Sequence, residues 1–140
     1  MAITRKSTKG FTEAERGAMQ ERNRELKAGR GTTEAEVLEK LAAMPAADRE
    51  LGEGLHELIM KMAPELTPKT WYGMPAYYRD GKMICFFQSA AKFKARYATL
   101  GFSDNANLDD GAMWPAYYAL TALNPDTEGR IAALLEQALS

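Results

Sequence analysis

The sequence has few of the residues that support disulfide, zinc or nucleophilic chemistry. It contains one cysteine and one histidine among 140 residues. A single cysteine excludes an internal disulfide. Because Cys85 lies in an apolar run, we expect a buried, inert thiol and a cytoplasmic, reducing setting. His56 has no second histidine and no nearby cysteine to complete a zinc motif, so we expect a surface or hydrogen-bonded structural role for it.

Several functional motifs are also missing. There is no glycine-rich phosphate loop, no serine-centred elbow and no His-Glu metal motif, so no reaction is indicated and we expect a non-enzymatic protein. No apolar run approaches the length of a membrane span. The basic N-terminus has no apolar region behind it, so we expect neither a membrane partner nor a secretion signal.

The charges are distributed unevenly along a chain of single-domain length. The net charge is −1, but residues 1–30 carry eight Lys and Arg against four Glu, whereas residues 101–140 carry one basic residue, Arg130, against six acidic ones. Glutamates alternate with the basic residues near the N-terminus, which favours a solvated helix face over a nucleic-acid site. We expect a basic tail and polar helix over residues 1–30 and an α+β domain over 31–140.

Capping signals and apolar periodicity predict four helices. Two TEAE capping boxes, at 12–15 and 33–36, begin helices that end near residues 28 and 43. A third helix has Pro45 in its first turn and ends before Pro64, and the last begins after Asn124, a helix-capping residue. Each of these segments has an apolar face suited to a core, although that of the first is weak.

Between the helices the pattern is typical of strands. An Asp80-Gly81 pair separates two β-rich runs, which predicts a hairpin with a two-residue turn. Residues 92–100 alternate between basic and apolar, and 113–120 favour a further strand at an edge, because Pro115 cannot donate a ladder hydrogen bond. We therefore expect a short antiparallel meander of three to four strands packed with N-terminal and C-terminal helices.

The two-residue turn predicts a register in which paired residue numbers sum to 161, so that both hairpin faces are mostly apolar. One face then holds Met74, Ala76, Tyr78, Met83, Cys85 and Phe87, and the other holds Pro75, Tyr77, Ile84 and Phe86. Two core helices can cover one face. The other must be covered by the N-terminal helix, a partner chain or a ligand. The candidate ligand-binding residues are Trp71, Tyr77, Phe86, Trp114 and, as a clamp for an anion, Arg96.

The stretch GFSDNANLDDGAMWP, residues 101–115, supplies hard oxygen ligands at Asp104, Asp109 and Asp110. These carboxylates are candidate metal ligands, although the spacing differs from that of a calcium loop. Asp, Asn and Gly are also the residues of tight turns. Turn formation and metal binding both stay open for this stretch.

Residues 70–102, TWYGMPAYYRDGKMICFFQSAAKFKARYATLGF, and residues 107–115, NLDDGAMWP, resemble the YdhG-like domain of unknown function. That family is grouped with the YjbR/CyaY-like and frataxin-like proteins. The resemblance implies a small α+β domain and a role as an iron chaperone, with iron as the implied metal.

Together these features predict a binding protein, with iron delivery to iron–sulfur assembly as its most specific form. The alternatives are a domain that binds a small anionic molecule and a protein-interaction module. We expect a small molecule or a metal as partner, no nucleic acid, and a monomer or homodimer.

Overall fold

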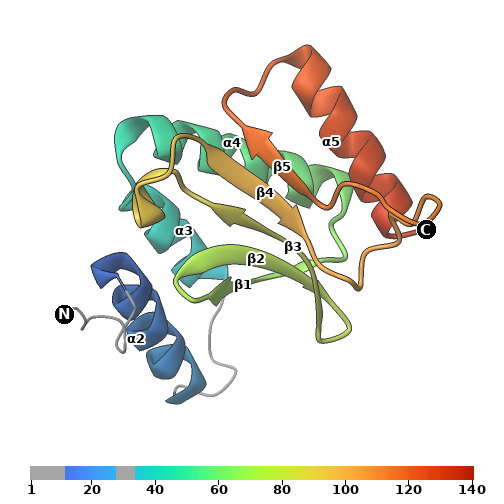
Figure 1. The fold of residues 1–140 in the computed structure, drawn as a ribbon. Coiled ribbons are helices and arrows are strands. Elements are labelled where there is room, and N and C mark those ends of the chain that lie inside the picture. Colours follow the sequence, from blue (N-terminus) through green and yellow to red (C-terminus); the bar gives the residue numbers. More distant parts are fainter. Residues whose placement is uncertain (1–11, 28–33) are drawn as a thin grey trace.

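The computed structural model describes residues 12–27 and 34–140, and these residues form one antiparallel sheet with helices packed against it (Figure 1). The helices are α2 (Glu13–Lys27), α3 (Glu34–Ala42), α4 (Ala46–Met62), α5 (Pro125–Ala138) and the short 3-10 helix η1 (Ala91–Phe93). The strands are β1 (Thr67–Trp71), β2 (Met74–Arg79), β3 (Lys82–Gln88), β4 (Ala98–Phe102) and β5 (Tyr117–Leu120). The predicted α+β class is confirmed, but the sheet has five strands where three to four were predicted.

The strands follow one another across the sheet in the order β1-β2-β3-β4-β5, so β1 and β5 form its edges. Two-residue turns join the first three strands. Both turns place two consecutive residues in the left-handed region: Tyr72 and Gly73 at φ 52° and 78°, and Asp80 and Gly81 at φ 54° and 81°. This geometry matches the twist of a hairpin, and it confirms the turn predicted from the Asp-Gly pair.

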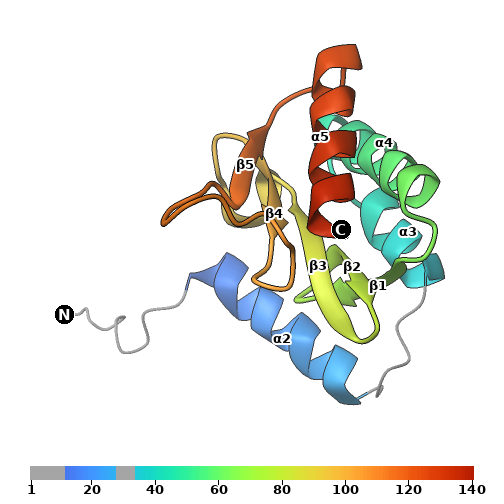
Figure 2. The same ribbon diagram turned by 90° about the vertical axis from the view of Figure 1, so that its right-hand side faces the viewer.

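Helices α3, α4 and α5 lie on one face of the sheet, whereas α2 lies on the other side and packs beside β1 and η1 (Figure 2). The main core lies between the three helices and the sheet. Its most deeply buried large side chains are Leu41, Leu55, Ile59, Tyr77, Ile84, Phe87, Leu100, Phe102 and Leu135. Each contributes about 1.5–3 kcal/mol by its removal from water. This arrangement leaves β5 and α5 side by side at one end of the molecule.

Local capping chemistry sets the starts of α2 and α5. The Thr12 hydroxyl accepts from the Glu15 N–H at 3.0 Å, and the Glu15 carboxylate accepts from the Thr12 N–H at 2.9 Å, which confirms the first capping box. The Asn124 side chain accepts from the Thr127 N–H at 2.9 Å. The second predicted box begins at Thr33, and with the predicted basic tail it lies outside the described residues.

The missed strand is β1, because the two prolines near its start, Pro64 before it and Pro68 within it, indicate only the end of a helix. Pro68 lies within β1 opposite Tyr77. A proline is tolerated there because β1 is an edge strand and its outer side needs no donor.

The strand predicted over residues 92–100 is wrong in its first part. The Asp48 carboxylate accepts from the N–H groups of Ala90 and Ala91, each at 3.1 Å, and holds a helical turn there. Lys94 follows in the left-handed region at φ 56°, and β4 begins only at Ala98. The basic residues of this segment therefore do not share a strand face.

The predicted hairpin register is wrong beyond its first two pairs. Tyr78 pairs with Met83 as expected, but a bulge follows, so that Tyr77 pairs with Cys85 and Ala76 with Phe86. The extra residue is Ile84, which shares the helix-side core with Cys85. Phe86 consequently lies on the opposite face of the sheet from Tyr77.

Candidate ligand-binding site

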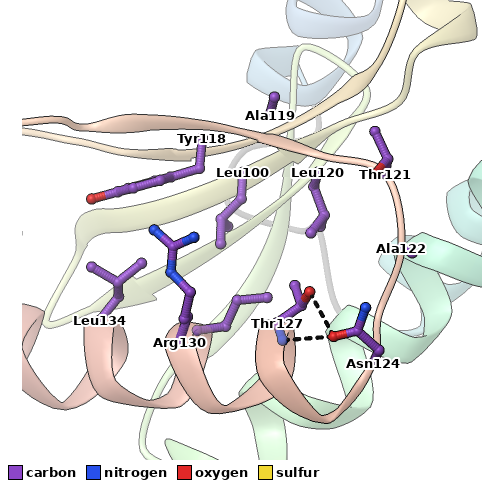
Figure 3. A pocket seen from close by; sticks show the side chains of 11 residues that line it. Leu100, Tyr118, Ala119, Leu120, Thr121, Ala122, Asn124, Thr127, Arg130 and Leu134 are labelled. Carbon is purple, nitrogen blue, oxygen red and sulfur yellow. Dashed lines mark hydrogen bonds between the residues drawn. The ribbon is translucent and has the colours of Figure 1, made fainter.

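A pocket of about 170 Å³ lies between the edge strand β5 and helix α5 (Figure 3). This volume is close to that of cavities that hold a benzene-sized molecule, about 150 Å³. Leu100, Leu120, Ile131 and Leu134 form its apolar wall. The pocket can therefore accept a ligand body of about six to eight non-hydrogen atoms.

Side chains alternate between the two faces along a strand and recur on one face every three to four residues along a helix. For this reason the lining side chains of β4, β5 and α5 point into the same pocket. Leu100 on β4 pairs with Tyr118 on β5, and both side chains face the helices, as does that of Leu120 two residues later. On α5 the lining residues Thr127, Arg130, Ile131 and Leu134 recur at intervals of three and four. The Asn124 cap holds the first turn of α5 through both the N–H and the hydroxyl of Thr127.

Arg130 supplies the positive charge of the pocket. Its side chain rises from α5 toward Tyr118 and Leu100 (Figure 3). It is the only basic residue between positions 101 and 140. No described residue forms an ion pair or hydrogen bond with Arg130, and this includes Asp126 one turn earlier. A guanidinium over an apolar wall is suited to an anionic group carried on an apolar body.

A second group of polar side chains lies in the core and connects the elements α3, α4 and β2 by hydrogen bonds. His56 on α4 accepts or donates at both ring nitrogens: Nδ1 is 2.9 Å from the Tyr77 hydroxyl, and Nε2 is 2.8 Å from a Glu34 carboxylate oxygen. His56 is 5% exposed and Tyr77 1%. A neutral imidazole satisfies both contacts, since the phenol donates to Nδ1 and the Nε2–H donates to the carboxylate. This confirms a hydrogen-bonded structural histidine.

Burial also removes chemical reactivity from this region. Cys85 lies opposite Tyr77 in the sheet, and burial raises the pKa of its thiol to about 12. Burial, and then the nearby Cys85 and Glu34, raise the pKa of the Tyr77 phenol as well. Both groups are thus protonated near neutral pH, and a protonated thiol is a poor nucleophile. The predicted buried, inert cysteine agrees with this placement.

The aromatic residues predicted to bind a ligand lie on two faces of the sheet. The ring of Phe86 contacts that of Trp71, with centroids 5.2 Å apart, and that of Tyr117, at 5.6 Å. This row lies on the face away from the main core, where Tyr117 is 66% exposed. Tyr77 points into the core on the other face. The structure therefore brings Trp71 and Phe86 together and separates Tyr77 from them.

Arg96 and Trp114 lie in connecting segments. Arg96 is exposed between η1 and β4, where its guanidinium lies 5.1 Å from the ring centroid of Tyr97. Trp114 is in the loop before β5 and is 36% exposed. Within the described ranges no hydrogen bond, ion pair or ring contact joins Arg96 to Trp114. The arginine that lines the pocket between β5 and α5 is Arg130, and Arg96 is not among its lining residues.

The three aspartates predicted as metal ligands are exposed in the loop after β4. Across residues 12–27 and 34–140, no three His, Cys, Asp or Glu side chains come together in a group that could hold a metal ion. Asp104, Asp109 and Asp110 therefore do not form a preassembled iron site. The start of this loop shows turn chemistry instead, since the Asn105 N–H and side chain bond Ser103 Oγ and the Met83 carbonyl, each at 3.1 Å.

Arg130 is not among the residues that the sequence predicted to bind a ligand. The available signal was a lone basic residue in an acidic segment, one position before the buried Ile131. That position puts Arg130 at the boundary of the apolar face of α5. The sequence predicted a strand near β5, but it could not predict that this strand lies across the pocket from α5.

Comparison of the chain with protein-family models, with curated proteins and with solved structures gives no match. Where the chain is described, none of its helices combines the length and the apolar character that crossing a bilayer requires.

Proposed function

We propose that this protein is a non-enzymatic binding domain for small organic anions with an apolar body. The anionic group lies on Arg130 and the apolar body enters the pocket between β5 and α5. The observation that carries the proposal is the placement of Arg130, an arginine that has no partner among the described residues and lines a pocket with one apolar wall. The proposal corresponds to the small-molecule alternative that the sequence suggested, but the arginine that binds the anion is Arg130 on α5 in place of Arg96.

The expected affinity is modest. A hydrogen bond to a charged group contributes about 1.5–3 kcal/mol, and buried apolar area contributes about 25 cal/mol per Å². Arg130 is exposed, so water and salt screen part of its attraction. A ligand of about eight atoms should then bind with a dissociation constant on the order of 1 mM, which corresponds to about 4 kcal/mol.

Iron delivery, which the family resemblance implies, has less support. Iron would be the cargo and would need several oxygen, nitrogen or sulfur ligands around one point. In the described part of the chain such ligands do not gather in a group of three. We therefore place the binding function in the pocket.

Calorimetric titration with hexanoate tests the proposal. We expect binding to the native protein, and at least about tenfold weaker binding to Arg130→Gln, because the charge-assisted contact is lost. The matched control is Arg96→Gln, which removes another exposed arginine and should leave the affinity unchanged. Hexanamide, which keeps the shape without the charge, should bind about as weakly as hexanoate binds to Arg130→Gln.

Two outcomes would contradict the proposal. One is the absence of hexanoate binding at concentrations well above 1 mM at low salt. The other is equal affinity in the native protein and Arg130→Gln. A folding defect does not confuse the comparison, because an exposed Arg→Gln change should alter stability by no more than about 0.5 kcal/mol.

A further inference from the structure

The hydrogen-bond pattern of β4 shows which backbone groups of β5 face outward. The Phe102 N–H donates to the Ala116 carbonyl at 2.9 Å, and Gly101 pairs with Tyr117, so Phe102 and Ala116 are directly opposite and hydrogen-bonded. On the other side, the Ser103 N–H donates to the Ile84 carbonyl at 3.0 Å. Even-numbered residues of β4 therefore bond to β5, and odd-numbered residues bond to β3.

It follows that alternate residues of β5 direct their backbone away from the sheet. Tyr118 and Leu120 pair with even-numbered residues of β4 and use their backbone groups there. Tyr117 and Ala119 form the non-hydrogen-bonded pairs, so their N–H and C=O groups point outward from the edge. Both residues are exposed, and among the described residues no backbone partner covers this side. The edge can therefore pair with another extended segment.

The open edge and the pocket share the same strand. Tyr118 and Leu120 line the pocket with their side chains, and α5 runs alongside β5 with the pocket between them (Figure 3). A segment paired with β5 would project every second side chain toward α5. Its residues opposite Tyr118 and Leu120 would then reach the apolar wall and Arg130.

We infer that the anion bound at Arg130 is an acidic side chain of an extended peptide that adds a strand to β5. An apolar side chain two residues away enters the pocket beside Ile131 and Leu134. This inference rests on the proposed function of the pocket. It supplies the partner class, since main-chain pairing gives affinity and the pocket gives specificity for alternate side chains.

Charge distinguishes a peptide partner from a second copy of this chain. Two β5 edges could pair antiparallel, but residues 113–121, MWPAYYALT, contain no acidic residue. A second β5 therefore offers no carboxylate to Arg130. The occupant that complements the site is a segment with an Asp or Glu flanked by alternating apolar positions.

Peptide pools of defined chemistry test this inference by NMR. The probe is a pool of acetylated, amidated heptapeptides with Asp at position 4, Val, Ile or Leu at position 6, and Ser, Thr or Lys elsewhere. We expect it to shift the amide signals of Tyr117 and Ala119 and to displace hexanoate. A pool with Asn at position 4 should need about tenfold more peptide for half-saturation.

The backbone contribution is tested separately. N-methylation at positions 3 and 5 removes the donors that face β5 and should weaken the Asp pool at least about tenfold. Tyr117→Pro removes an outward N–H from β5 at a residue that does not line the pocket, at an edge where a proline is tolerated, and should weaken the peptide while hexanoate affinity is unchanged. If this variant does not fold, the N-methylated pool provides the same test on the native protein.

The results separate the two proposals. If hexanoate binds and the Asp pool does not, or if N-methylation leaves the affinity of the pool unchanged, the peptide inference is overturned and the anion pocket stands. If neither hexanoate nor the Asp pool binds, both are overturned.

Discussion

Substitution of Tyr77 by phenylalanine should reveal how strongly the buried hydrogen-bond chain ties the domain together. The change removes one oxygen atom and leaves His56 Nδ1, 2.9 Å away, without its partner. Tyr77 is 1% exposed and His56 5%, so water cannot take the place of the hydroxyl. An unsatisfied buried polar group costs about 1–3 kcal/mol. For a domain of this size we expect the melting temperature to fall by about 3–10 °C.

Urea denaturation followed by tryptophan fluorescence measures this cost. Tyr117→Phe is the matched control, because it removes the same atom from a residue that is 66% exposed, and it should change stability by no more than about 0.5 kcal/mol. In a double-mutant cycle, His56→Leu with Tyr77→Phe should cost at least about 1 kcal/mol less than the sum of the single changes. A Tyr77→Phe variant as stable as the control, or two single costs that simply add, would refute a stabilising hydrogen bond between Tyr77 and His56.

Three other predictions follow from the backbone and the core. Gly101→Ala should lower the free energy of unfolding by about 1–3 kcal/mol in denaturant titration, since a Cβ there would lie 2.4 Å from the Phe86 ring. The control is Gly17→Ala, whose Cβ meets nothing within 4 Å and which should raise the free energy of unfolding by up to about 1 kcal/mol, because alanine favours a helix. Gly81→Val should lower the urea midpoint by the equivalent of about 1 kcal/mol or more, because φ is 81° there, and an unchanged midpoint would count against the turn. Burial raises the pKa of the Cys85 thiol from its ordinary value of 9.0 to about 12, so the stability contributed by the buried, protonated thiol is complete below pH 9 and is lost as the pH rises toward 12. The native protein should therefore lose its stability advantage over Cys85→Ala across that window. A constant difference in stability would argue against burial of the thiol.

The features predicted correctly from sequence depend on a few neighbouring residues. The capping box at Thr12 and the cap at Asn124 need only side chains three positions apart. The Asp80-Gly81 turn needs two residues that tolerate positive φ. These caps and turns are determined within four to six residues, so they can be predicted without knowledge of the tertiary structure.

The errors arise where distant residues override the local pattern. Residues 92–97 alternate like a strand, but the Asp48 carboxylate, 42 residues away from Ala90, holds a helical turn that includes the first two of them. The bulge at Ile84 moves each β3 residue after it to the face opposite the one predicted, because the core takes two consecutive side chains, Ile84 and Cys85. The alternation of apolar and polar residues predicts neither the helical turn nor the bulge.

The position of the candidate site could not be predicted from the sequence. An anion clamp among apolar and aromatic side chains was expected, yet the pocket forms from β5 and α5, which the sequence gives no reason to place together. Trp71 and Phe86 do meet on the second face, but Tyr77 does not join them, since the register depends on the bulge. Arg130 becomes a candidate only once its lack of a partner in the described structure is known.

The central claim is that an anion binds between β5 and α5, and mapping hexanoate by amide chemical shifts tests it most directly. We predict that the largest saturable shifts fall on Leu100 and residues 118–134, which together include the pocket lining, and that they disappear in Arg130→Gln. Acetamide at equal concentration controls for non-specific effects. Shifts centred on Arg96 and Trp114, on the Asp104–Asp110 loop, or unchanged in Arg130→Gln would contradict the account.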